Sequence, residues 1–467
     1  MRSGDVIRAG MTDLHFTKSS NISAPVESLR DWHFRPGAFG RLNPPWEKAR
    51  VLSEPGPLVD GFRAVIEVTA GPIKQLWTAD HEITGDGFID RQISGPFARW
   101  EHHHQFQATG PKTSRLTDSI TFRLPLGAPG RLFGESFVRK KLERMFDYRH
   151  AVTGADLARA ARNPPPQSLR VLVTGASGML GRPLCAYLET QGHEVHRVTR
   201  RVTGPDEIAW DPEAGTFDLP AGAAYDAAIH LAGENVADAR WSPEKKRRIL
   251  ESRRLGTRLF ARTLAAMERP PTVLVSASGS GIYPHDGEIH DESSEVGDHY
   301  LSQVCRVWEE ETAPAKEAGI RVVLARIGVV LSPTGGALQK MLPVFLAGAG
   351  GPIGSGKQRL SWIAMDDVLD LLHRATFETS WEGPVNLTAP EPITNRDFAS
   401  TLARVLHRPS LITAPAAAIK TIFGEMADET LLADLAVVPR RLFSLGYSFR
   451  FPDLDSALRH LLGRPLS

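Results

Sequence analysis

The chain has 467 residues, 42% hydrophobic and 23% charged, which is too long for one ordinary core and predicts two or three folded domains. Its 55 lysines and arginines nearly balance 54 aspartates and glutamates, and the net charge of +1 gives no electrostatic reason to expect nucleic acid or an anionic membrane as a partner. We therefore expect a small-molecule partner and no nucleic acid.

The two cysteines, Cys185 and Cys305, both fall in helix-like patterns, so the sequence suggests neither a disulfide framework nor a cysteine zinc site. The first ten residues, MRSGDVIRAG, lack the charged-then-apolar pattern of a secretory signal. The sequence contains no run of about 18 uninterrupted apolar residues. These features together predict a cytoplasmic protein without a membrane span.

The first predicted domain covers residues 1–161. Apolar and polar residues alternate over Phe62–Val68 and Trp100–Phe106, which predicts strands of a mainly antiparallel sheet. From Arg131 to Ala161 the period changes to about 3.6, as in a helix that packs one face on a curved sheet. The apolar positions that carry this period are Leu132, Phe133, Phe137, Leu142, Met145 and Phe146. We predict an α+β domain.

A row of three histidines lies in the second of these strands. On a strand of period two, His102 and His104 share a face with Trp100 and Phe106, while His103 points to the other face. Two histidines spaced in this way could in principle bind a metal, but no carboxylate or cysteine partner is evident at ligand spacing. A polar element of a ligand cavity and ordinary strand packing remain the other interpretations, and we predict no metal site.

A proline-rich linker is predicted at residues 162–168, because three consecutive prolines in it stop a helix and favour an extended connector. The second domain, residues 169–467, alternates helical segments with short apolar runs rich in β-branched residues. These runs are Arg170–Thr174, Ala227–Leu231, Thr272–Ser276 and Arg321–Ala325. The alternation predicts an α/β fold of the Rossmann type, a doubly wound parallel sheet covered by helices on both faces.

A glycine-rich loop follows the first of these runs and precedes an amphipathic helix predicted at Arg182–Gln191. Glycines at positions 175, 178 and 181 allow a tight turn, a close approach of backbone amides to a pyrophosphate, and close packing of the helix. A chance glycine turn is the alternative. The predicted cofactor-binding residues of the loop are Gly175, Ala176, Ser177, Gly178, Met179, Leu180 and Gly181.

The next predicted strand, Glu194–Arg201, ends where an NAD enzyme usually carries an acidic side chain for the ribose hydroxyls. Here Arg200 and Arg201 occupy that end. A guanidinium group binds a 2′-phosphate that a carboxylate would repel, so the sequence favours NADP(H), with Arg200 as a phosphate contact. An ordinary pair of solvated arginines is the alternative.

The segments Thr174–Gly181 and Asp226–Gly233 resemble the extended short-chain dehydrogenases/reductases, and more narrowly their atypical branch of NAD-dependent epimerase/dehydratase-like proteins. The resemblance covers nearly all of residues 169–463, including a carboxy-terminal segment, Pro439–Tyr447, typical of that branch. It implies an oxidoreductase or epimerase that uses a nicotinamide dinucleotide, and the choice of NADP(H) rests on the arginine pair described above. It also implies that Leu231, Ala232 and Gly233 lie along the cofactor, where small side chains allow close approach. Tight packing of helix on sheet is the competing interpretation.

The resemblance weakens at the catalytic residues. The superfamily uses a serine near the end of the fifth strand and a Tyr-x-x-x-Lys pair on the next helix, where the lysine lowers the pKa of the tyrosine. Ser278 has the serine's place, but Tyr300 is followed four residues later by Val304. The family's lysine position is Gln303, and the residue four before it is His299. The standard pair is therefore absent.

Two functional hypotheses follow from that absence. In the first, the protein is an enzyme that reduces or epimerises a small molecule, with Ser278, Tyr283 or His299 handling the proton. In the second, the domain binds NADPH without catalysis and acts as a sensor or scaffold. The substrate is expected between the cofactor and a smaller carboxy-terminal lobe, and the loop Gly354–Trp362 is the predicted contact of that lobe with the substrate. In this loop, Lys357 and Arg359 either meet an anionic group or are simply solvated.

The amino-terminal domain resembles the START-like polyketide cyclase/lipid-transport superfamily over roughly residues 12–155. The segments that carry the resemblance are Trp32–Phe39, Arg41–Trp46, Asp90–Phe97 and Trp100–Phe106. Such helix-grip folds wrap a curved sheet around a long helix and leave an apolar cavity between them. The resemblance therefore implies a module that binds a hydrophobic ligand.

Overall fold

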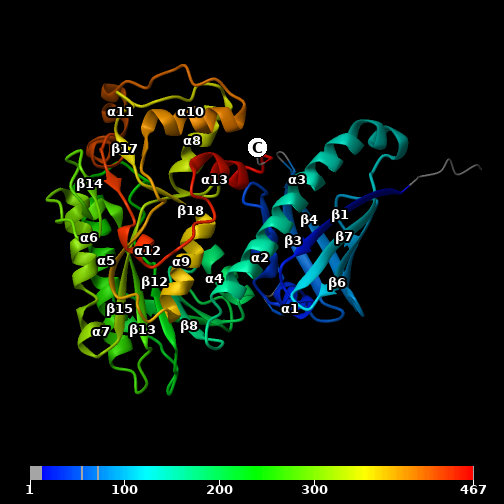
Figure 1. The fold of residues 1–467 in the computed structure, drawn as a ribbon, viewed down its shortest axis with the longest axis horizontal. Coiled ribbons are helices and arrows are strands. Elements are labelled where there is room, and N and C mark those ends of the chain that lie inside the picture. Colours follow the sequence, from blue (N-terminus) through cyan, green and yellow to red (C-terminus); the bar gives the residue numbers. More distant parts are fainter. Residues whose placement is uncertain (1–12, 54–55, 71–72, 466–467) are drawn as a thin grey trace, which may run out of the picture. The chain divides into compact units, whose positions relative to one another are not determined.

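The computed structural model describes residues 13–53, 56–70 and 73–465 (Figure 1). They form two compact units: one extends to Pro164, and the other runs from Pro165 onward, Glu189–Gly192 excepted. This division falls within the predicted proline linker. None of the helices built from the described residues combines the length and the apolar composition that a membrane crossing requires.

The amino-terminal unit is built on a seven-stranded antiparallel sheet in the order β1-β7-β6-β5-β4-β3-β2. The strands are β1 (Leu14–Ile22), β2 (Ala49–Val51), β3 (Arg63–Ala70), β4 (Ile73–Thr84), β5 (Gly87–Ser94), β6 (Arg99–Gly110) and β7 (Thr113–Arg123). Helices α1 (Val26–Phe34), α2 (Ala38–Leu42) and the long α3 (Gly127–Arg162) accompany this sheet (Figure 1). The predicted α+β class is confirmed, and the two predicted strands correspond to β3 and β6.

Helix α3 packs its apolar side chains on the sheet from Val138 onward. Leu142 and Phe146 are buried against residues of β1, β6 and β7. Leu132 and Phe137 are 78% and 69% exposed, so their predicted packing is wrong, and the side chain of Phe133 lies outside the described residues. Length explains the difference: 36 helical residues extend about 54 Å, whereas the 12 residues of β6 span only about 40 Å, so the helix continues past the sheet.

The carboxy-terminal unit is built on an eight-stranded sheet in the order β11-β10-β9-β8-β12-β13-β15-β19. All neighbouring strands pair in parallel except β10 and β11. The strands are β8 (Arg170–Thr174), β9 (Glu194–Thr199), β10 (Glu207–Asp211), β11 (Thr216–Phe217), β12 (Ala227–His230), β13 (Val273–Gly279), β15 (Arg321–Ile327) and β19 (Gly383–Leu387). The predicted parallel sheet is confirmed.

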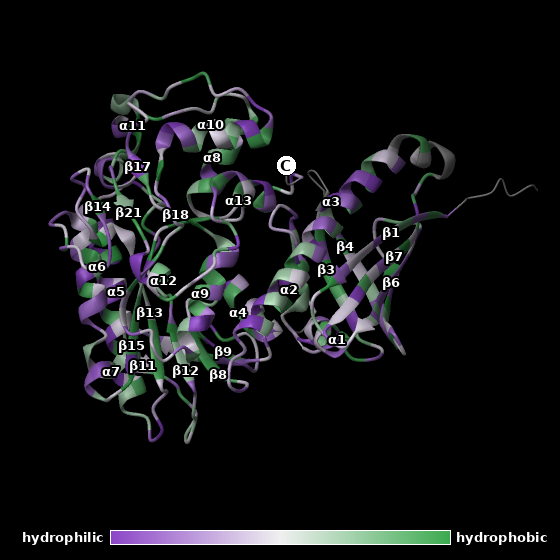
Figure 2. Cartoon of the chain, in the orientation of Figure 1, coloured by the Kyte–Doolittle hydropathy of each residue, from purple (hydrophilic) through white to green (hydrophobic). Residues whose placement is uncertain are grey.

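Both faces of this sheet are covered by helices. Alternate residues of each strand enter different cores: Val171 and Val173 pack with α4 (Gly181–Thr190) and α9 (Met365–Phe377). Leu172, between them, packs with Phe260 of α5 (Pro243–Ala265). In Figure 2 the central strands are coloured as hydrophobic, whereas α5 carries hydrophilic colour. Burial on both faces explains why the strand sequences are continuously apolar.

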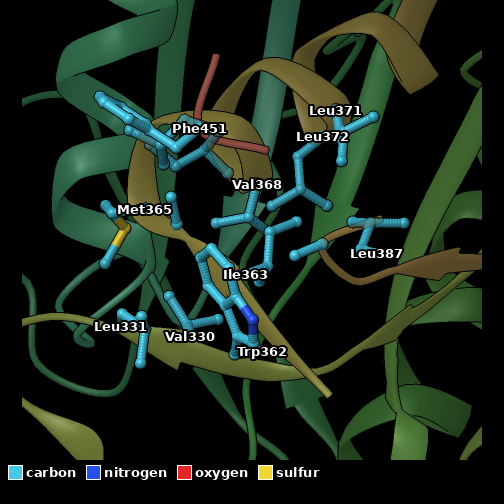
Figure 3. Close-up of a cluster of buried hydrophobic side chains, with 14 of the residues drawn as sticks. Val330, Leu331, Trp362, Ile363, Met365, Val368, Leu371, Leu372, Leu387 and Phe451 are labelled. Atoms are coloured by element: carbon cyan, nitrogen blue, oxygen red, sulfur yellow. The ribbon is translucent and has the colours of Figure 1, made fainter. Parts of the chain in front are cut away.

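The carboxy-terminal lobe joins the sheet through a second parallel pair, β16 (Val329–Leu331) and β18 (Trp362–Ala364). Figure 3 shows Trp362 and Ile363 of β18 packed with Val330 and with residues of α9. The further elements are η1 (Ser280–Ile282), β14 (Ile289–His290), α6 (Tyr300–Glu310), α7 (Ala313–Glu317), α8 (Gly336–Leu346), β17 (Arg359–Leu360), β20 (Ile393–Thr394), α10 (Asn395–Leu406), α11 (Ala416–Phe423), η2 (Ala427–Leu431), β21 (Ala436–Val437), α12 (Arg440–Ser444) and α13 (Leu454–Leu461).

Candidate functional site

The strand order reverses direction between β8 and β12. From β8 the chain first adds β9 and β10 on one side and then returns to place β12 on the other side. The connections at the carboxyl ends of β8 and β12 therefore leave the sheet in opposite directions and open a crevice between them, where ligands of open parallel sheets bind. The glycine loop follows β8, and residues 231–233 follow β12.

The glycine loop fits a bound phosphate because its backbone lies where side chains cannot. Gly175 has a φ of +69°, and a Cβ atom there would lie 2.8 Å from the carbonyl carbon of Leu231. A Cβ atom at Gly181 would lie 2.1 Å from the carbonyl oxygen of Gly175. The amide of Gly178 donates to that same oxygen at 2.9 Å. Ser177 and Gly178 are exposed in the loop just before α4, where the helix dipole favours an anion.

One buried histidine holds the two strand ends together. Nδ1 of His230 lies 2.7 Å from Oγ1 of Thr174, and its Nε2 lies 3.0 Å from Oγ1 of Thr257. The Thr174 oxygen also accepts the amides of Leu231 and Ala232 at 3.2 and 3.4 Å. Burial, and to a lesser degree Arg253, lowers the pKa of His230 to about 3, so the imidazole is neutral. The sequence analysis missed this role, although a histidine within an apolar strand is a signal for it.

The residues after β12 also pack against a buried arginine. A Cβ atom at Gly233 would lie 3.1 Å from Cζ of Arg253. The Arg253 guanidinium donates to the carbonyl oxygen of Glu234 at 2.9 Å and lies 4.7 Å from the ring centroid of Trp308. Close packing of Arg253 from α5 is one reason for a glycine at position 233, and Leu231 and Ala232 are half-buried beside it.

Arg200 lies in the loop that begins where β9 ends, and its side chain is exposed. The following residue is fixed by Thr199, whose hydroxyl accepts the Arg201 amide at 3.3 Å and donates to the Arg201 carbonyl at 3.2 Å. The strand therefore ends two residues earlier than its predicted end at Arg201. Arg200 thus follows the carboxyl end of the second strand, the place from which a side chain reaches the ribose in this type of fold.

Two predicted catalytic hydroxyls belong to one buried polar network. Ser278 Oγ donates to Oε1 of Glu309 at 2.7 Å, and both oxygens of Glu309 accept from Arg326 at 2.8 Å. Arg326 also donates to the hydroxyl of Tyr283 at 2.9 Å, and that hydroxyl donates to Oδ1 of Asn386 at 2.7 Å. The network joins the ends of β13, β15 and β19 to α6. The sequence analysis missed Glu309, Arg326 and Asn386.

The Tyr283 side chain is fully buried, and its ring lies parallel to that of His290 with centroids 5.7 Å apart. Burial raises the pKa of Tyr283 to about 12, although the neighbouring Arg326 acts in the opposite direction. The hydroxyl therefore keeps its proton at neutral pH and acts as a hydrogen-bond donor.

His299 caps the start of α6 and contacts the carboxy-terminal lobe. Its Nδ1 lies 3.2 Å from Oε2 of Glu429 in η2, and its Nε2 lies 3.0 Å from the carbonyl oxygen of Tyr283. Its ring is stacked on that of His285 with centroids 3.9 Å apart. Burial lowers the pKa of His299, but Glu429 outweighs it, so the pKa is raised. Glu429 also accepts the first two amides of α6, at 3.0 and 2.8 Å.

Gln303, the residue at the family's lysine position, forms a hydrogen bond with the backbone before α6. The Gln303 side-chain amide donates to the carbonyl oxygen of Asp298 at 3.1 Å. In the lobe loop, the Arg359 guanidinium binds both carboxylate oxygens of Asp434, each at 2.9 Å, while Lys357 is exposed. Arg359 thus ties the loop to the segment before β21, and its predicted contact with an anionic group stays a prediction.

A doubly wound parallel sheet with a glycine loop at its switch point defines a dinucleotide-binding fold of the short-chain dehydrogenase/reductase type. The model of the NAD dependent epimerase/dehydratase family matches residues 171–384, and the chain belongs to this family. Residues 414–461 match a domain family of unknown function, DUF1731. Residues 22–146 match the polyketide cyclase/dehydrase and lipid transport family, as the sequence resemblance implied.

Relatives and solved structures agree with this assignment. The epimerase family protein Mb2239 of Mycobacterium bovis is 38% identical over 297 residues, 63% of this chain and 98% of that protein. A crystal structure described as the nucleoside-diphosphate sugar epimerase of Corynebacterium glutamicum is 33% identical, with a TM-score of 0.78, and covers 96% of this chain and 90% of that one. The human epimerase family protein SDR39U1, crystallised with NADPH, is 36% identical, with a TM-score of 0.58, over 62% of this chain and 98% of that one.

Proposed function

We propose that the carboxy-terminal unit binds NADP(H) and uses it to oxidise, reduce or epimerise a small molecule. The observation that carries this proposal is the glycine loop, where added Cβ atoms at Gly175 and Gly181 would collide with backbone 2.8 and 2.1 Å away. Such a bare backbone at the start of a helix suits a pyrophosphate. The NADPH in the crystals of the human relative supports the choice of cofactor.

Each part of the crevice has a separate role in this proposal. The residues from Gly175 to Gly181 bind the diphosphate, Leu231, Ala232 and Gly233 lie along the cofactor, and Arg200 binds the 2′-phosphate. When bound, the nicotinamide ring supplies or accepts a hydride. The neutral His230 fixes the spacing of the two strand ends without placing a charge beside the cofactor.

We assign the handling of the substrate proton to Ser278, Tyr283 and His299. Glu429 favours the protonated form of His299, so this histidine can hold a proton to donate near neutral pH. Tyr283, with a pKa raised to about 12 by burial, keeps its proton and would orient an oxygen as a donor when it releases its bond to Asn386, rather than removing a proton. Ser278 is a donor whose partner, Glu309, keeps its two bonds to Arg326 when the serine turns away.

A second candidate function is NADPH binding without catalysis, as a sensor or scaffold. One observation favours it: the hydroxyls of Ser278 and Tyr283 are both bonded within the protein, and Gln303 stands at the lysine position. In this case, cofactor binding would stabilise the unit without turnover.

For the amino-terminal unit we propose the binding of a hydrophobic ligand. The match to the polyketide cyclase/dehydrase and lipid transport family and the aromatic residues buried around Trp32 and Phe106 support this proposal.

The low cysteine count suits a reducing compartment, and we propose that the protein is located in the cytoplasm.

Purified protein incubated with NADPH and a panel of carbonyl compounds separates the two functions. Loss of NADPH absorbance that Ser278→Ala reduces at least about tenfold supports the enzyme. The matched control is Ser276→Ala on the same strand, because among the described residues the Ser276 hydroxyl hydrogen-bonds only to the neighbouring backbone oxygen of Ala277. Tight NADPH binding without turnover on the whole panel supports the sensor. Failure to bind either nicotinamide cofactor contradicts both.

A further inference from the structure

The amino-terminal unit contains a compact cluster of buried histidines and carboxylates that the proposed function does not use. Asp90 on β5 pairs directly across the sheet with His102 on β6, and His104 on β6 pairs with Asp118 on β7. These register pairs place all four side chains on one face of the sheet. His102 and Asp118 are each only 3% exposed.

Three atoms of this cluster converge on a common point. Oδ2 of Asp90 lies 3.0 Å from Nδ1 of His102 and 3.3 Å from Nε2 of His104. One donor atom of each residue lies within 4.8 Å of the donor atoms of the other two. Two ligands about 2.1 Å from a tetrahedral ion are roughly 3.4 Å apart, so small shifts would bring these atoms to metal-ligand spacing.

Asp118 orients both imidazole rings from the opposite side. Its Oδ1 lies 2.8 Å from Nε2 of His102 and 2.8 Å from Nδ1 of His104. A buried carboxylate accepts hydrogen bonds, so each ring presents an N–H group to Asp118 and turns its other nitrogen toward Asp90. A carboxylate behind the ligating histidine is the usual outer partner at metal sites, where it fixes the tautomer and raises the basicity of the ligand.

Asp118 is itself held in place. Its second oxygen, Oδ2, lies 2.7 Å from Nε2 of His150 on α3, and Nδ1 of that histidine lies 2.8 Å from Oγ of Ser20 on β1. Residues of β6 and α3 therefore contact the Asp118 carboxylate directly, and Ser20 of β1 supports it through His150. Such a rigid outer shell is what a preorganised metal site requires.

Charge leads to the same conclusion. Two ring nitrogens that face Asp90 with their lone pairs repel it, and Arg149, which interacts electrostatically with Asp90 and Asp118, supplies one positive charge against two carboxylates. A divalent cation between Asp90, His102 and His104 removes both problems. Protons on the two ring nitrogens are the competing way to balance the charge.

We propose that Asp90, His102 and His104 bind a divalent transition-metal ion, with Asp118 as the carboxylate that positions both imidazoles. Two imidazole nitrogens and one carboxylate oxygen suit Zn²⁺ or Fe²⁺, and three protein ligands leave coordination positions for an oxygen of a small molecule. The ligand of this unit would then combine an apolar body with an oxygen donor. This inference is independent of the nucleotide site.

The test uses the full chain without a histidine tag, treated with chelator, dialysed and titrated with Zn²⁺. We expect one ion per chain by atomic emission. Asp90→Asn should abolish uptake, and Asp118→Asn should weaken affinity by about 10- to 100-fold, the usual effect of an outer-shell change. The matched control is His103→Ala on the same strand, because His103 faces the other way, toward Glu101, and is 40% exposed. This control should bind as the unchanged protein does.

A second measurement does not depend on variants. Co²⁺ added to the unchanged protein should give visible absorption bands of a four- or five-coordinate site, and Zn²⁺ should displace them. Uptake that Asp90→Asn and the unchanged protein share equally, or Co²⁺ spectra identical to those of the aquated ion, would mean that the cluster holds protons only. Either result overturns the proposal. If a variant fails to fold, the Co²⁺ spectrum of the unchanged protein alone decides.

Discussion

Each unit contains a buried histidine, and the pKa values of the two histidines are shifted in opposite directions. His230 lies between the hydroxyls of two threonines, and burial, with a smaller contribution from Arg253, lowers its pKa to about 3. His102 is also buried, but it lies between Asp90 and Asp118; burial lowers its pKa, and without a metal ion the two carboxylates outweigh burial and raise the pKa to about 9. The partner atoms, rather than burial, determine the charge of the ring.

This difference matches the demands of the two sites. A neutral His230 fixes the spacing of the two strand ends without placing a charge beside the anionic cofactor that we propose there. Carboxylates around the histidines of the other unit create a site that requires positive charge. Substitutions at these groups should therefore have different effects in the two units.

Asp118→Ala should destabilise the amino-terminal unit by about 3 to 5 kcal/mol, because it leaves buried histidines without their shared acceptor. The measurement is urea unfolding followed by tryptophan fluorescence. The control is Asp147→Ala, whose carboxylate is 63% exposed and pairs with Lys18 at the surface, where such pairs contribute less than about 1 kcal/mol. Equal effects of the two substitutions would remove the distinction between the charged interior and the surface.

Gly181→Ala should weaken NADPH binding about 100-fold, equivalent to about 2.7 kcal/mol, because the new Cβ would lie 2.1 Å from the Gly175 carbonyl oxygen. Calorimetry measures the affinity. The control is Gly204→Ala, where an added Cβ meets nothing within 4 Å. Unchanged affinity in the Gly181 variant would exclude the loop as the diphosphate site. Zinc uptake by the other unit should be the same in both variants.

Acid should destabilise the carboxy-terminal unit through His230. Its pKa is lowered from 6.5 to about 3 on folding, so between these values the unfolded chain binds the extra proton. Stability from this group is complete above pH 6.5 and is lost as the pH falls below it, by about 1.4 kcal/mol per pH unit. His230→Gln should reduce the loss in unfolding free energy between pH 7 and pH 5 by about 2 kcal/mol. An identical loss in both proteins would contradict a neutral His230.

Arg200→Glu should reverse the preference for NADPH over NADH and change the ratio of the two affinities at least about tenfold, because a carboxylate repels the 2′-phosphate and accepts hydrogen bonds from ribose hydroxyls. The matched control is Arg247→Glu, an equal change of charge at an exposed arginine of α5 that pairs with Glu244. If both substitutions lower NADPH affinity alike, general charge accounts for the effect and Arg200 has no specific contact.

The sequence predicted both folds and the glycine loop because these depend on local patterns. The strand period, the helix period and the glycine spacing can each be recognised within a segment of about twenty residues. The partners of the predicted site residues come from distant segments: Glu429 lies 130 positions from His299, and Asn386 lies 103 positions from Tyr283. No spacing rule connects such residues, since only the tertiary fold brings them together.

The histidine row shows the same limit at shorter range. Along the chain, no carboxylate stands at ligand spacing from His102 and His104. Asp90 and Asp118 lie on the strands to either side of β6, and the antiparallel register sets them opposite His102 and His104. The error on Leu132 and Phe137 has another cause, since a helical period predicts an apolar face but not how far the opposing sheet extends.

Glu429 links the carboxy-terminal lobe to His299, the residue that we propose as a proton donor. Its carboxylate caps α6 and sets the proton affinity of His299, yet it belongs to η2 of the lobe. Displacement of η2 by an entering molecule would withdraw that negative charge, and the imidazole would release its proton more readily. The position of η2 would thus set how readily His299 gives up its proton.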